Sequence, residues 1–326
     1  MLQIKNNVNY KHRLPARGGK IKTARGKPLI RDIAMQHHAY GYAAFIAVCL
    51  GIAPVTLAEL EPISESAMGD VTGQAFLQVD NISGATHEFT RMTLGMDVET
   101  RVNIDDVKIG EIDGGSDFAA SHIALGHISR DASAVQYDGN TYAVGEVVPF
   151  EAVQPYIELA ETHDKTQLSG FRMGFRQARG SVSSLTSSFS GNIGLKLTDS
   201  AGTEHDATLF NAASSATDYR ATHIGINDGT ADCSAGVNCA PLSHLQSVIV
   251  GTDNGDTTTG FTDDFFIGFQ REGVEWTSPD GANVINAGKG VFINLPTNMK
   301  VDMNTLVNQG VSRLQTHRTD MGTKLF

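Results

Sequence analysis

The stretch Leu60–Asp80, LEPISESAMGDVTGQAFLQVD, separates two parts of the chain that differ in composition. Before it lie a basic arm and an apolar run over residues 43–58. After it come short segments of alternating hydrophobicity, separated by Gly, Asn and Asp. Inside the stretch, Ser64 is placed to cap a brief helical turn over residues 65–68, and the alternation begins at Gln74. The sequence therefore predicts a leader, a short helical turn and then a β-rich part.

The leader and the rest of the chain carry opposite net charges. Residues 1–58 contain nine Lys and Arg against one acidic residue, whereas the 268 residues that follow contain 16 basic and 35 acidic residues. A basic segment, an apolar run and small residues at Thr56 and Ala58 are typical of a secretory signal peptide, with cleavage between Ala58 and Glu59. A retained membrane anchor is the alternative, although the run is short for a span of roughly 20 residues and contains Gly and Pro.

The start of the expressed chain stays open. A start at Met35 would give a leader of ordinary length and leave residues 1–34 unexpressed, but that shorter leader lacks the Lys and Arg of a signal peptide. Once the leader is removed, no apolar run is long enough to span a membrane. We therefore expect residues 59–302 to form a β-rich domain in the periplasm, at the cell surface or outside the cell. Residues 303–326 are expected to form a helical cap or tail.

Two cysteines, Cys233 and Cys239, remain after removal of the leader, in the segment CSAGVNC. In an oxidising compartment this pattern predicts one disulfide that closes a short loop. Metal binding is the alternative, but the flanking His223 and His244 are not at zinc-ligand spacing. The acidic balance also argues against nucleic acid as a partner, because a chain without a basic stripe repels the phosphate backbone.

Alternation with a period of two predicts an all-β fold. Residues 96–104 place Met96, Val98 and Val102 on one side of a single long strand. Further strands are predicted over residues 121–128, 141–148, 156–160, 169–177, 191–197, 222–226, 245–250, 265–271 and 291–295. Only residues 303–314 show a helical period, weakened by Gly310.

Seven predicted strands carry glycine directly after a hydrophobic residue, for example Met173-Gly174 and Ile267-Gly268. Most of these glycines are separated by near multiples of about 16 residues, a spacing that suits the coils of a degenerate β-solenoid. An irregular meander would look similar. The sequence leaves an elongated sheet or degenerate solenoid open beside a β-sandwich or rolled sheet.

No complete catalytic motif is present. Gly288-Lys289-Gly290 lacks the third glycine of a dinucleotide-binding loop, and the serine-rich residues 181–188 look like an exposed strand edge or turn. Asp253, Asn254 and Asp256 supply oxygen ligands for calcium but lack the spacing of a calcium-binding loop, so a simple turn is the alternative. We expect no other cofactor.

Several segments resemble one known family. The residues are Leu60, Met68, Val71, Gly73 and Gln74, then VNIDDVKIG (102–110), PYIEL (155–159), GFRMGF (170–175) and DFFIGFQ (264–270). They resemble a family of secreted proteins of Gram-negative bacteria, some members of which are labelled pilus-system proteins of the Fil type. The resemblance implies export and a role in surface filaments or the envelope, without catalysis. It assigns no functional residue.

We therefore predict an exported, non-enzymatic structural protein, a subunit or assembly component of a pilus-like or fimbrial surface filament. Its partners would be further copies of itself or other envelope proteins, contacted through strand edges. The alternative is a secreted carbohydrate-binding or adhesive module, for which Tyr142, Tyr156 and Trp276 would have to line one exposed face. A hydrolase would require two facing carboxylates in a cleft.

Overall fold

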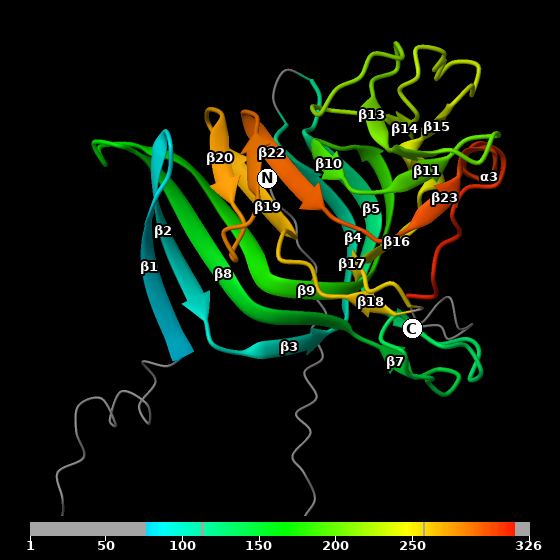
Figure 1. Ribbon diagram of the computed structural model, residues 1–326, viewed down its shortest axis with the longest axis horizontal. Helices are drawn as coiled ribbons and strands as arrows, with labels where there is room; N and C mark the ends of the chain where they lie inside the picture. Colours follow the sequence, from blue (N-terminus) through cyan, green and yellow to red (C-terminus); the bar gives the residue numbers. More distant parts are fainter. Residues whose placement is uncertain (1–75, 112–113, 257, 317–326) are drawn as a thin grey trace, which may run out of the picture. The chain divides into compact units, whose positions relative to one another are not determined.

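In the computed structural model, which describes residues 76–111, 114–256 and 258–316, one strand holds the main sheet together (Figure 1). This strand is β9 (Leu168–Ser188). Its first half pairs with β8 (Phe150–Thr162) and β19 (Phe266–Gln270). Its second half pairs with β5 (Phe118–Leu125) and β16 (Ser247–Val250). The all-β prediction is confirmed, while the leader, the cleavage site between Ala58 and Glu59 and the turn over 65–68 lie outside the described residues.

The change of neighbours along β9 begins at Gly180. Its φ is +131°, a backbone conformation that favours glycine. A Cβ at this position would lie 3.0 Å from the Cα of Phe150, so both conformation and space require glycine. One strand thereby changes direction and serves two groups of strands.

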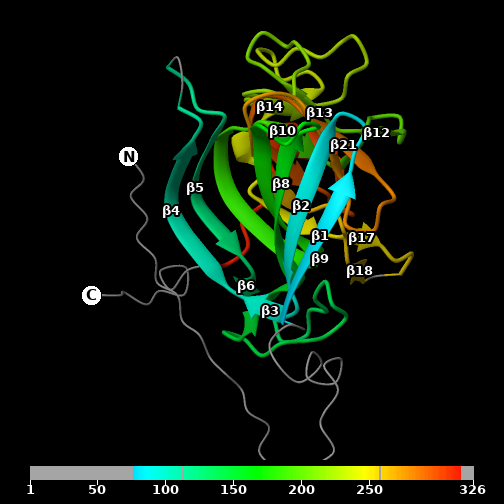
Figure 2. The ribbon, with the colours of Figure 1, turned by 90° about the vertical axis from the view of Figure 1, so that its left-hand side faces the viewer.

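The bend divides the sheet into two arms (Figure 2). The first arm has the order β1 (Leu77–Ser83), β2 (His87–Leu94), β8, first half of β9, β19, β22 (Gly290–Leu295) and β10 (Gly191–Ile193). The second arm contains β4 (Val102–Ile109), β5, the second half of β9 and β16. We call the face of each arm that is turned toward the other arm its inner face. β1 and β4 are edge strands, each paired with one neighbour among the described residues.

The chain passes from the first arm to the second at Arg101. β3 (Asp97–Thr100) pairs with β8, whereas β4 pairs with β5. The prediction of one long strand over residues 96–104 is therefore wrong. Residues 96–104 do alternate in hydrophobicity. Two successive short strands give the same alternation as one long strand when each strand has one side turned inward.

The other elements are short. They are β6 (His127–Ile128), β7 (Val147–Val148), β11 (Lys196–Thr198), β12 (Glu204–Asp206), β13 (Thr208–Phe210), β14 (His223–Gly225), β15 (Cys239–Pro241), η2 (Leu242–His244), β17 (Thr252–Asp253), β18 (Thr259–Gly260), β20 (Val274–Thr277), β21 (Val284–Ala287), β23 (Lys300–Asp302) and α3 (Met303–Asn308). Each of the other ranges for which the sequence predicts a strand, from 121–128 to 291–295, contains one. The range 141–148 holds only the two residues of β7. Among the described residues, no helix has the length and hydropathy of a membrane span.

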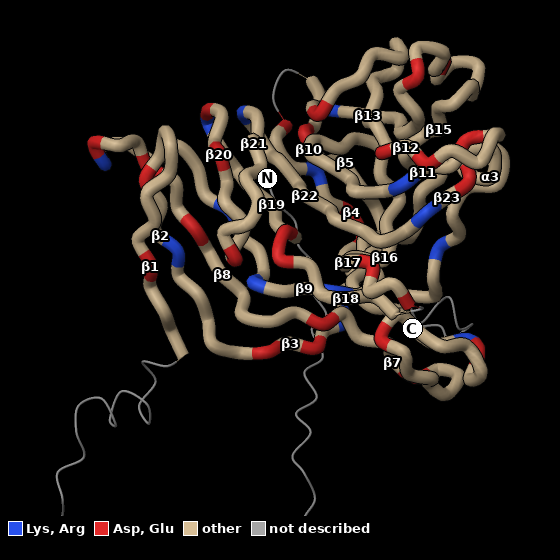
Figure 3. Tube along the Cα trace, viewed as in Figure 1, with Lys and Arg blue, Asp and Glu red and all other residues tan. Residues whose placement is uncertain are grey.

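The outer face of the first arm carries a buried ionic cluster. The Oε2 atom of Glu158 lies 2.6 Å from Nε of Arg91 and 2.9 Å from Nη2 of Arg172. Arg172 is fully buried and Glu158 almost so. Figure 3 shows such charged positions within β2 and β8. Removing these groups from water is costly, and the shared carboxylate and the carbonyl of Thr277, which accepts from both arginines, offset that cost.

The hairpin β20–β21 covers this cluster. Trp276, on β20, is fully buried, with the Arg172 guanidinium carbon 5.0 Å from its ring centroid and 5.3 Å from that of Tyr156. Trp276 therefore belongs to the core and does not lie on an exposed face. This cation–π packing and the hairpin together close the outer face.

Two of the regularly spaced glycines make room beneath this hairpin. A Cβ on Gly174 would lie 2.7 Å from Oη of Tyr156, and a Cβ on Gly268 would lie 2.8 Å from Oε1 of Gln270. Both lie inside strands, and most strand pairs are antiparallel, with β10–β22 and β11–β23 as parallel exceptions. The spacing therefore reflects close packing on a bent antiparallel sheet, and not the parallel coils of a solenoid.

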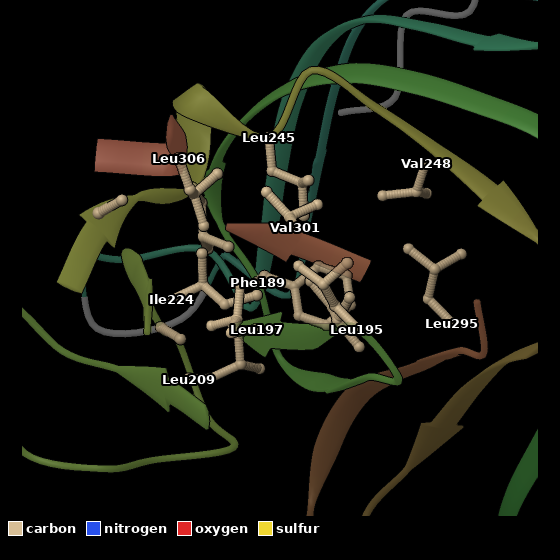
Figure 4. Close-up of a cluster of buried hydrophobic side chains, with 14 of the residues drawn as sticks. Phe189, Leu195, Leu197, Leu209, Ile224, Leu245, Val248, Leu295, Val301 and Leu306 are labelled. Carbon is tan, nitrogen blue, oxygen red and sulfur yellow. The ribbon is translucent and has the colours of Figure 1, made fainter. Parts of the chain in front are cut away.

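The largest hydrophobic core lies where the second arm meets the short strands and α3 (Figure 4). Ten of its residues are Phe189, Leu195, Leu197, Leu209, Ile224, Leu245, Val248, Leu295, Val301 and Leu306. Asp302 caps α3 by accepting a hydrogen bond from the Thr305 amide, 2.8 Å away. The predicted helix begins at Met303, as expected, but ends at Asn308 because Gly310 has a φ of +70°.

The predicted disulfide between Cys233 and Cys239 is present. It closes the loop between β14 and β15, and both cysteines are buried against Phe210. The bridge therefore fixes a loop at the edge of the core.

Replacing Gly180 by alanine is expected to destabilise the fold. Alanine disfavours a φ of +131°, and its Cβ would press on Phe150, so we expect a loss of about 1–3 kcal/mol in the free energy of unfolding. Urea denaturation measures the loss. Gly288→Ala is the control, because no atom lies within 4 Å of its Cβ position. Equal stability of both variants would contradict the role given to Gly180.

We expect the contact of the β20–β21 hairpin with Thr86 and His87 to become weaker in acid. Burial opposes ionisation of Glu275, but hydrogen bonds from Thr86 and His87 outweigh it and lower its pKa from 4.5 to about 2. Because the folded pKa is below the unfolded one, the stabilisation is present above pH 4.5 and is lost as the pH falls toward 2. Urea denaturation over this window should show a weaker pH dependence for Glu275→Gln than for the wild type. Identical pH dependence would refute this assignment.

Candidate functional site: an apolar cleft between the two arms

A cleft of about 670 Å³ lies between the inner faces of the two arms. We call it the apolar cleft. The first arm contributes Leu77, Met92, Leu94, Pro155, Tyr156, Ile157, Met173, Gly174, Phe175, Ile193, Phe265, Phe266, Ile267, Ile293 and Leu295. The second arm and the segments next to it contribute Phe118, Ile123, Leu125, Val182, Ser184, Thr186, Phe189, Leu242, Leu245 and Val248. The volume is in the range of ligand-binding sites, roughly 300–1,000 Å³.

The register of the first arm produces one continuous apolar row across the sheet. In cross-strand order, the row is Val79, Met92, Ile157, Met173, Ile267 and Ile293. Because side chains alternate between the two faces of a strand, all six point to the inner face. Val79, Ile157 and Met173 are 55%, 44% and 41% exposed.

The first arm thus has an unusual division between its faces. Its outer face buries the charged Arg91, Glu158 and Arg172 under a hairpin, whereas its inner face leaves Ile157 and Met173 open to solvent in the middle of the sheet. In most soluble proteins charged side chains are exposed, and large contiguous apolar surfaces are buried. The first arm has the opposite arrangement on both of its faces. The inner face is therefore the part of the first arm to examine for a binding role.

Two free strand edges accompany the cleft. β1 pairs only with β2, and β4 only with β5, among the residues that the structure describes. Phe76 and Leu77, where the described chain begins, are 50% and 48% exposed, and Leu77 lines the cleft. An edge strand with exposed apolar side chains is a template for pairing with another extended chain.

The lining of the cleft offers little polar recognition. It contains no charged side chain, and the hydroxyls of Ser184 and Thr186 lie 2.8 Å apart and hydrogen bond to each other. The cleft therefore selects for apolar surface and shape, and not for a specific charge.

The serine-rich residues 181–188 are the last eight residues of β9 and lie between β5 and β16, so the prediction of an exposed edge or turn is wrong. Ser181 and Ser183 are fully buried. The Oγ atom of Ser183 lies 2.7 Å from Oγ of Ser247, and that of Ser181 lies 2.9 Å from Nδ1 of His127. Cross-strand partners satisfy these hydroxyls, which allows a polar sequence to occupy the interior.

The contact between His127 and Ser181 resembles a nucleophile with its base but is closed to solvent. Burial lowers the pKa of His127, whose Nε2 atom lies 3.0 Å from Oε1 of Gln136. Because Ser181 has no exposed surface, no substrate reaches it in this conformation. The pair connects β9 to β6, and the contact with Gln136 extends this connection to the loop that follows β6.

The residues proposed for calcium organise a turn before β18. Oδ1 of Asp253 accepts from the Gly255 amide at 2.8 Å, and Oδ1 of Asp256 accepts from the Thr258 amide at 2.6 Å. Asn254 donates to the Thr258 hydroxyl. Within the described ranges, no three His, Cys, Asp or Glu side chains converge as metal ligands. The calcium site at Asp253, Asn254 and Asp256 stays a prediction.

The aromatic residues required for an adhesive face do not lie together on the surface. Tyr156 and Trp276 are buried, and Tyr142 is partly buried and donates a hydrogen bond to Asp138. An adhesive site would need other aromatic residues.

Comparison of the chain with protein-family models, curated proteins and solved structures returned no match. The resemblance to Fil-type pilus-system proteins therefore stays a prediction. The segments 102–110, 170–175 and 264–270, which carry it, fall mainly on β4, β9 and β19. Met173 and Phe175 from the second segment and Phe265 and Ile267 from the third line the cleft, whereas no residue of 102–110 does.

An anilinonaphthalene sulfonate dye is expected to bind the apolar cleft and to fluoresce there. Met173→Gln places a polar group in the middle of the apolar row, and we expect it to lower dye affinity several-fold. Val284→Gln is the matched control, since Val284 is 59% exposed and lies on β21, outside the cleft. Fluorescence titration measures both affinities. An equal loss in both variants would mean that the dye does not report the cleft.

Proposed function

We propose that this chain is an exported structural subunit of a surface filament, and that an extended segment of a second copy occupies its apolar cleft. The observation that supports this function is the exposed apolar row beside the free edge of β1. An incoming strand can form backbone hydrogen bonds to β1 and bury alternate side chains in the cleft. Assembly then covers the surface that a single subunit leaves open.

The position of the chain end favours the residues before β1 as the incoming segment. The described residues begin with Phe76, which directly precedes the cleft-lining Leu77. Cleavage before Glu59 would leave 17 residues ahead of Phe76, which reach about 56–61 Å when fully extended. They include Leu60, Ile63 and Val71 as apolar groups for the cleft of a second copy.

A second copy also suits the charge of the chain. The residues after Ala58 carry 35 acidic against 16 basic side chains, so two copies repel each other over most of their surfaces. The cleft lining carries no charge and is therefore the surface on which contact costs least. Such repulsion elsewhere confines association to one defined site.

The decisive comparison is between chains that begin at Glu59 and at Phe76. We expect the longer chain to form filaments or regular oligomers in negative-stain electron microscopy and sedimentation velocity, and the shorter chain to stay a folded monomer. The deletion must stop at residue 75, because Leu77 already belongs to β1 and lines the cleft.

Point variants separate the cleft from general surface effects. Ile157→Glu should abolish assembly of the longer chain, because it buries a charge in the occupied cleft. Val284→Glu, on exposed β21, should assemble normally. Assembly of the shorter chain would overturn the choice of segment. A monomeric longer chain that retains a lipid in native mass spectrometry would overturn the structural function and assign the cleft to an apolar ligand.

A further inference from the structure

A second cavity, of about 400 Å³, shares no lining residue with the apolar cleft. Four parts of the chain that are far apart in the sequence form it: Asp117; Ser190; Asp218 and Tyr219; and Gly288 to Phe292, where β22 begins. The last part contains the Gly288-Lys289-Gly290 sequence, which lacks the third glycine of a nucleotide loop. Neither the fold nor the proposed assembly explains why these residues surround an open space.

The floor of this cavity is rigid and electrically balanced. Asp117 is 2% exposed, and its two carboxylate oxygens accept hydrogen bonds from Nε of Arg220 at 2.9 Å and from the Val291 amide at 3.0 Å. The hydroxyl of Ser190 donates to the backbone carbonyl of Asp117. The charge of the carboxylate is therefore matched by the guanidinium beside it.

Glycine at position 290 keeps the cavity open. A Cβ there would lie 2.5 Å from Oδ2 of Asp117 and 3.6 Å from Cε2 of Tyr219, so any side chain would fill the space between them. The φ of Gly290, +109°, also disfavours other residues. The gap between the Asp117 floor and the Tyr219 ring is thus built into the backbone.

The rim combines an aromatic ring with one charge of each sign. Tyr219 is 45% exposed, and the Arg220 guanidinium carbon lies 4.9 Å from its ring centroid, which fixes the orientation of the ring. Asp218 and Lys289 are both exposed and line the same cavity. Their charges balance, so the cavity as a whole does not attract a charged ligand.

We propose that this cavity is a subsite for one neutral pyranose unit of a glycan. A pyranose presents C–H groups on one face and hydroxyls around its edge. The exposed Tyr219 ring supplies an apolar surface for the face, while the Asp218 carboxylate accepts and the Lys289 ammonium donates hydrogen bonds to hydroxyls. The site does not select for a phosphate or other anion, because Arg220 and Lys289 are balanced by Asp117 and Asp218 and leave no net positive charge.

Saturation-transfer difference NMR on the chain beginning at Glu59 tests the subsite. The probes are the methyl glycosides of glucose, galactose and N-acetylglucosamine. We expect at least one to receive saturation on its ring protons and to lose about tenfold in affinity with Tyr219→Ala. Tyr219→Phe keeps the ring and should retain binding.

Phe76→Ala is the matched control, because it removes an equally exposed aromatic ring outside this cavity. It should leave sugar binding unchanged. Absence of saturation transfer to all three glycosides, or equal binding by wild type and Tyr219→Ala, would overturn the proposal. Neither result depends on filament assembly, since the shorter chain beginning at Phe76 contains the whole cavity and should bind the same sugar.

Discussion

The bend of β9 at Gly180 is the constraint on which the rest of the structure depends. A straight strand of this length would extend one flat sheet, whose two faces would each need a separate cover. With the bend, the halves of one strand pair with four others, and the inner faces of the two arms line the same space. Only glycine meets both the backbone angle and the close approach to Phe150. The bend of β9 therefore produces the cleft by turning two apolar faces toward each other.

The outer layer explains how the cleft can remain apolar and open without unfolding the protein. The hairpin β20–β21 and the Arg91–Glu158–Arg172 cluster hold the outer face of the first arm. A separate, larger core around Leu195, Leu197 and Leu306 holds the second arm to the short strands. Neither group needs an occupant in the cleft, so the occupied and empty states can share one fold.

The sequence predicted the all-β class, the strand regions other than residues 96–104, the disulfide and the start of the C-terminal helix. These features depend on local patterns, such as alternation, turn residues, cysteine spacing and the helical period of residues 303–314. The cleft was not predictable in the same way. In the segment YIELA, both alternating sets contain large apolar residues, so the pattern cannot tell that Tyr156 is covered while Ile157 is open. Only the register with neighbouring strands, a property of distant segments, distinguishes the two faces.

Residues 181–188 of β9 give a second case in which the sequence pattern did not predict burial. Here a polar segment is buried, although its composition predicts exposure. Eight residues that include five serines look like a solvent-exposed edge, because serine is most often exposed. In the structure, hydroxyl pairs across strands replace water as partners, as with Ser183 and Ser247. Ser184 and Thr186, which have small polar side chains, line the cleft on the side opposite the apolar row of the first arm. Larger side chains at these positions would fill the space between the arms. The serine-rich sequence therefore helps to keep the cleft wide enough for an extended chain.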